Sequence, residues 1–184
     1  MPDNNTLLQS NYLTYDYILY QLELIQEKIL TIQSFISGPM EEIDITKLSL
    51  DKFPIMYVEP TNVQVNNFIQ SYTFNIAILD KIEMNKGING QPLENSNKPF
   101  ADAQKMRTQI YSQANEIMKD IIIQFKQNLI TRSWINSNVD LALPIDLTPI
   151  SSEYDTSLYG WTGTFVITAN NKNDICNTPA LTNT

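Results

Sequence analysis

Histidine is absent from this chain of 184 residues, and cysteine occurs once, at Cys176. Without histidine the chain lacks the commonest general base, the Ser-His-Asp triad and the usual ligand of catalytic zinc. A single cysteine excludes an internal disulfide, and no histidine is available to activate it as a nucleophile. We therefore expect no cofactor, no metal site and no catalytic residue, and we interpret the chain as a protein that is not an enzyme.

Basic residues are also few, with 12 Lys and Arg against 20 Asp and Glu, which gives a net charge of −8. Binding to nucleic-acid phosphates or to anionic membranes needs clustered Lys and Arg. No apolar run approaches the roughly 20 residues that a membrane-spanning helix requires. Glycine is scarce, and Gly87 and Gly90 lie in a polar segment rather than in a phosphate-binding loop. The composition therefore predicts no specific nucleic-acid binding and no membrane partner.

Some residues that could carry chemistry remain. Paired carboxylates can perform glycosidic acid–base catalysis or bind a metal ion. Such groups occur in connectors or at outward strand positions, where charge serves solubility, and we interpret them as surface residues: Glu41, Glu42 and Asp44; Asp140 and Asp146; Glu153 and Asp155. Two tryptophans could form a sugar-stacking platform. Trp161 falls in a core strand pattern, whereas Trp134 fits either role.

The segment 68–80 shows a long alternation of side chains, and we expect the rest of the chain to be arranged around it. One side of the alternation is apolar except for Gln70 and the other is small and mostly polar: Phe68, Tyr72, Phe74, Ile76 and Ile78 against Ile69, Ser71, Thr73, Asn75 and Ala77. Successive side chains of a strand point to opposite faces, so this segment predicts a long strand with one apolar face. An apolar layer must cover that face.

Two helices with apolar stripes are predicted to provide the cover. The first spans 6–36, with Asn5 or Thr6 as its N-cap and Gly38-Pro39 at its end. The second starts at Pro99 and ends between 128 and 132. The remaining expected segments are a connector at 39–52, a strand at 53–59, a turn at 60–62, strand character from Val63 with a kink at 66–67, an exposed loop at 84–97, strands at 139–147 and 158–169, and a polar C-terminal tail at 170–184.

The element order predicts one domain over 1–184 of the α+β class, with a mostly antiparallel sheet and two long helices packed on one face. Pro144 indicates an edge strand or a break within 139–147. The first helix carries more apolar and tyrosine surface than one sheet face requires. That surplus either is buried in a single chain or contacts a second chain, since tyrosine is favoured at interfaces. Our candidate interface residues are Tyr12, Tyr17, Tyr20, Leu24, Tyr57 and Trp134.

This combination resembles the tail-terminator or tail-completion fold of tailed bacteriophages, and most of all the neck or ring proteins of crAss-like phages. The element order carries the resemblance over most of the chain. Its most specific segments are Phe53-Pro54-Ile55-Met56-Tyr57-Val58-Glu59-Pro60, Tyr72-Thr73-Phe74-Asn75-Ile76-Ala77-Ile78-Leu79-Asp80, Trp161-Thr162-Gly163-Thr164-Phe165-Val166-Ile167, and Asp174-Ile175-Cys176 with Pro179.

The resemblance implies a structural virion protein, assembled in the host cytoplasm, that forms a closed ring of sixfold or twelvefold symmetry at the head–tail junction. The portal or other neck and tail ring proteins would be its partners, and genomic DNA would pass through the channel without sequence-specific binding. The loop at 84–97 would reach the next ring or the lumen, through Met84, Lys86, Asn89, Gln91 and Leu93. A monomeric or dimeric binding module and a small carboxylate-dependent hydrolase are the alternatives, with a decoration or fibre-adaptor protein as a third.

Overall fold

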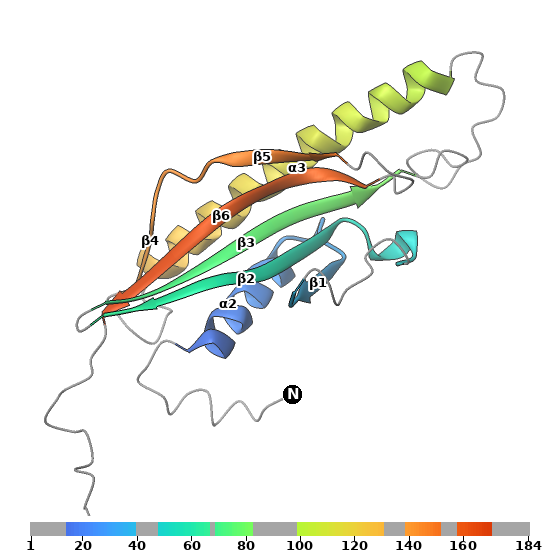
Figure 1. Ribbon diagram of the computed structural model, residues 1–184. Helices are drawn as coiled ribbons and strands as arrows, with labels where there is room; N and C mark the ends of the chain where they lie inside the picture. The colour runs from blue at the N-terminus through green and yellow to red at the C-terminus, as the bar shows by residue number, and fades with distance from the viewer. Residues whose placement is uncertain are drawn as a thin grey trace, which may run out of the picture.

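A computed structural model describes residues 14–39, 48–66, 69–82, 99–130, 139–151 and 158–170 (Figure 1). The elements in these ranges are α2 (Tyr15–Lys28), β1 (Ser34–Ser37), the 3-10 turn η3 (Leu50–Lys52), β2 (Ile55–Val65), β3 (Ile69–Lys81), α3 (Pro99–Ile130), β4 (Val139–Leu141), β5 (Leu147–Ser151) and β6 (Leu158–Asn170). None of the described helices is long and apolar enough to cross a membrane.

The strands form one 6-stranded sheet in the order β1-β2-β3-β6-β4, with β5 also pairing with β6. Only the β1–β2 pair is parallel; the pairs β2–β3, β3–β6, β4–β6 and β5–β6 are antiparallel. Since β3 lines one side of β6 along its length, β4 and β5 share the other side, where they form one interrupted edge. The prediction of an α+β fold with a mostly antiparallel sheet is confirmed.

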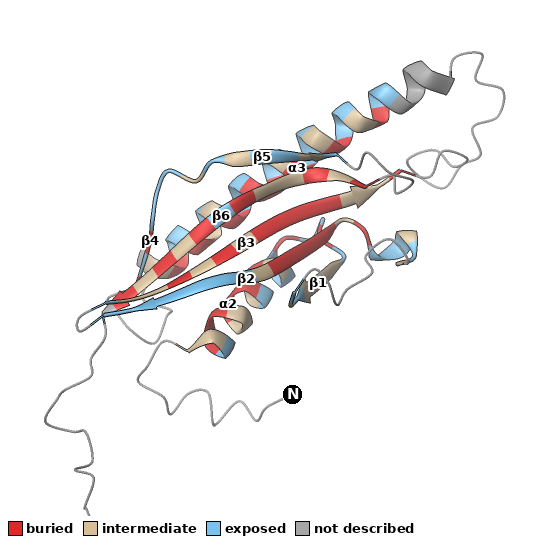
Figure 2. Ribbon diagram, in the orientation of Figure 1, coloured by how far each residue is buried: buried red, intermediate tan, exposed pale blue. Residues whose placement is uncertain are grey.

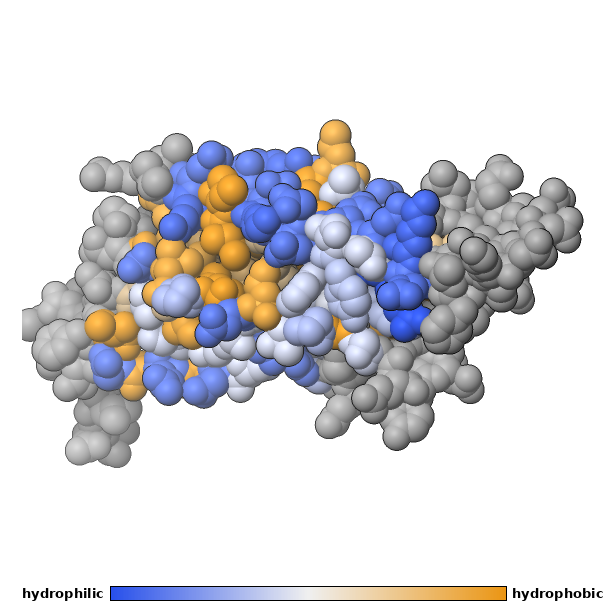
Figure 3. Space-filling view, turned by 90° about the horizontal axis from the view of Figure 1, so that it is seen from above, coloured by the Kyte–Doolittle hydropathy of each residue, from blue (hydrophilic) through white to orange (hydrophobic). Residues whose placement is uncertain are grey.

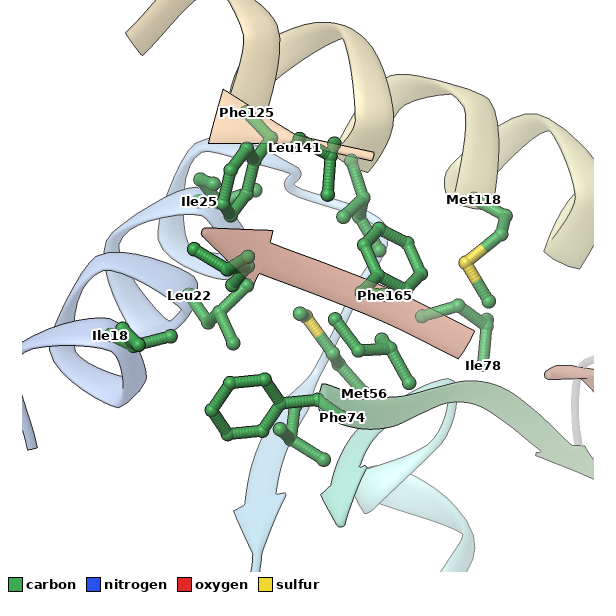
Figure 4. Close-up of a cluster of buried hydrophobic side chains, with 14 of the residues drawn as sticks. Ile18, Leu22, Ile25, Met56, Phe74, Ile78, Met118, Phe125, Leu141 and Phe165 are labelled. Carbon is green, nitrogen blue, oxygen red and sulfur yellow. The ribbon is translucent and has the colours of Figure 1, made fainter. Parts of the chain in front are cut away.

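Both helices pack on the same face of the sheet, because their apolar residues share one core with alternate residues of the strands (Figure 4). Phe74, Ile76 and Ile78 of β3 lie on this face and are fully buried, as the alternation predicts. The helical residues of the core come from α2 and α3, and they include Ile18, Leu22, Ile25, Met118, Ile121 and Phe125. Residues of β6 close the core, with Phe165 and Ile167 fully buried.

The helix predicted over 6–36 ends earlier than expected, so this prediction is wrong at its C-terminal end. α2 ends at Lys28, and residues 34–37 form β1 beside β2 instead of continuing the helix. The N–H of the C-cap residue Ile29 donates to the carbonyl of Gln26, and the Gln26 amide donates to the carbonyl of Ile32 at 3.0 Å. Gly38, with φ 136°, follows a strand and not a helix. At the start of α2 the Thr14 hydroxyl accepts from the N–H of Tyr17 at 3.2 Å, and the predicted caps lie outside the described residues.

The region 60–67 also differs from the prediction. The expected turn at 60–62 is a register shift between Pro60 and Asn62 inside β2, so Val63 and Val65 belong to β2 and not to the central strand. The chain reverses after Asn66, whose N–H donates to the carbonyl of Ile69 at 2.9 Å. The break predicted at Pro144 is confirmed, because residues 142–146 separate β4 from β5. The loop at 84–97 and the tail beyond residue 170 lie outside the described residues.

Candidate interaction surface

The β2–β3 hairpin changes character along its length. The first four residues of β2 are buried and the last six are exposed, as the colour change in Figure 2 shows. Exposure is unusual for the apolar side chains there: Val63 is 49%, Val65 63% and Ile69 42% exposed. The outer half of β2 is therefore exposed, whereas Tyr72 and Phe74 in the facing part of β3 stay buried.

The position of α2 explains this division. Its first residue, Tyr15, stacks on Phe74 with ring centroids 5.9 Å apart, and Phe74 pairs with Pro60 across the hairpin. Beyond this contact Tyr72 stacks on Phe74 at 6.4 Å, and its hydroxyl accepts from the Gln70 amide at 2.7 Å. Burial raises the pKa of the Tyr72 hydroxyl, while that hydrogen bond lowers it. Val63 pairs with Tyr72 and Val65 with Gln70, so the two exposed valines lie on the strand beside these buried or half-buried residues of β3.

Three other large apolar side chains of the described residues are exposed: Leu30 at 89%, Ile123 at 50% and Leu143 at 46%. Leu30 follows α2, and Ile123 lies on the outer side of α3. Leu143 lies between β4 and β5, at the sheet edge opposite β1 and β2. Seen from above, hydrophobic residues gather in the left half of the view and hydrophilic ones surround them (Figure 3).

The face of the sheet opposite the helices has two parts. One part is a small apolar cluster that includes Phe53, Ile55, Tyr57, Leu79 and Leu158. The other part, toward the hairpin tip, carries short polar side chains, among which the Thr164 hydroxyl donates to the Asn75 amide oxygen at 3.0 Å. No described helix covers this polar part. It is open surface of low charge.

The predicted interface residues fall into three groups. Tyr17 and Tyr57 are only 4% and 2% exposed and belong to the cores on either side of the sheet, so they offer almost no surface to a second chain. Tyr20 and Leu24 are half-buried. Tyr12 and Trp134 lie outside the described residues, as do Met84, Lys86, Asn89, Gln91 and Leu93. The surplus surface of the first helix is therefore partly explained by burial in a single chain.

Tyr57 has a structural role instead. Its hydroxyl donates to the carbonyl of Gly38 at 2.6 Å, which ties the end of β1 to β2. Burial, with a smaller contribution from the charge of Glu59, raises the pKa of Tyr57 to about 12. The hydroxyl is therefore a hydrogen-bond donor at every physiological pH.

An aromatic cluster that the sequence pattern did not identify joins α3 to β5 and β6. The Trp161 indole N–H donates to the carbonyl of Tyr111 at 2.8 Å, and the Tyr111 hydroxyl donates to the carbonyl of Ile150 at 3.1 Å. Tyr159 contacts the edge of Tyr111, and the Arg107 guanidinium lies 5.6 Å from the centre of the Tyr159 ring. The cluster fixes the helix to the sheet, and Trp161 packs against the core as expected.

The described residues offer little for catalysis. No three His, Cys, Asp or Glu side chains among them lie close enough together to bind a metal ion. Asp140 and Asp146 are exposed, and the other carboxylate groups and Cys176 lie outside the described ranges. Half-buried Asp80 lines a crevice with Pro54, Ile110 and Gln113, and this crevice has no interior space even for a water molecule. Burial raises the pKa of Asp80, although the N–H of Lys81 donates to its carboxylate at 2.7 Å and lowers it.

No protein-family model matches the chain, and no curated protein matches it.

Proposed function

We propose that this chain is a structural subunit of a closed homo-oligomeric ring at the head–tail junction of a tailed bacteriophage. The proposal combines the resemblance in sequence to tail-terminator and neck proteins with the α+β fold. It assigns the protein to the virion. Its neighbours would be the portal or other neck and tail ring proteins.

One observation carries the proposal: exposed apolar side chains occur at both edges of the same sheet. Val63 and Val65 lie at the β2 edge, and Leu143 lies at the β4–β5 edge. A ring needs two different surfaces on each subunit, because each copy contacts its two neighbours through unlike patches. The two edges are unlike in sequence and in strand length, so together they suit a head-to-tail contact.

The charge of the chain suits a channel for DNA. With a net charge of −8, a ring of many copies carries a strong negative field. DNA phosphates are repelled by such a surface, because non-specific binding depends on the release of counterions by Lys and Arg. The genome would therefore pass the ring without adhering to it.

The proposal is tested with the full chain purified at several concentrations, by size-exclusion chromatography with light scattering, and by mass spectrometry of phage particles. We expect one large species of fixed mass and recovery of the protein in virions. A monomer at every concentration, absent from particles, would contradict the proposal. A monomer that binds glycans or metal ions would favour the binding-module or hydrolase alternative instead.

A further inference from the structure

We draw no further inference here: the strongest candidate, the exposed apolar surface patch that Val63 and Val65 form on the outer half of β2, carries no proposal because nothing in the described part of the chain shows what covers it.

Discussion

Replacing Phe74 with alanine should be one of the most damaging single changes in this protein. Phe74 is fully buried at the point where α2, β2 and β3 meet, and it stacks on Tyr15 at 5.9 Å and on Tyr72 at 6.4 Å. Removal of a buried phenylalanine side chain costs about 3–5 kcal/mol. That loss is a large part of the roughly 5–15 kcal/mol by which a domain is stable.

The milder change Phe74→Leu separates the contribution of the aromatic pairs from that of the buried apolar volume. Leucine retains most of the apolar volume and loses two aromatic pairs, each worth about 0.5–1.5 kcal/mol, so it should cost about 1–3 kcal/mol. Denaturant unfolding at one fixed protein concentration measures both free energies, with exposed Leu30→Ala as the control that should change stability by no more than about 0.5 kcal/mol. If Phe74→Ala costs less than about 1 kcal/mol, Phe74 does not join the helix to the hairpin and the described core is wrong.

Three further predictions concern the sheet. Gly160→Ala should cost about 3 kcal/mol or more, because its Cβ would lie 1.8 Å from the backbone oxygen of Ile78. Gly163→Ala should cost less, because the two closest atoms to its Cβ are side-chain methyls of Leu147 and Ile145 at 2.9 and 3.0 Å, and thermal unfolding ranks the two variants. Asp80→Asn should stabilise the protein at pH 7, because the raised pKa of Asp80 makes wild-type stability fall as pH rises above the ordinary aspartate pKa; unfolding from pH 3 to 7 should show the advantage disappear in acid. Tyr57→Phe should cost about 1 kcal/mol near neutral pH through a lost hydrogen bond, and its stability should fall less than that of the wild type between pH 10 and the pKa of about 12; equal alkaline curves would contradict this.

The elements with an unambiguous period were predictable from sequence. The stripe of α3, with proline in its first turn, fits only a helix, and the alternation of 72–78 fits only a strand. The segment 29–36 is different, because Ile29, Ile32 and Ile36 recur at helical spacing and are also β-branched residues typical of strands. Pairing with Ile55–Val58, which lies distant in sequence, decides in favour of β1. The spacing of apolar residues within 29–36 cannot predict this pairing with a distant segment.

The candidate surface was only partly predictable. The tyrosines of the first helix indicated an interface, yet Tyr17 faces the core because the helix turns it toward the sheet. The exposed outer half of β2 depends on where β1 ends and α2 begins, and neither position follows from the residues of β2. One sequence signal was present, namely the uncharged run from Pro60 to Leu79.

The proposal of a ring is tested most directly by electron microscopy of the purified full chain at concentrations where it associates. We predict closed annuli of one diameter with a central channel and a fixed number of copies. Solitary particles, or open filaments of variable length, would contradict it.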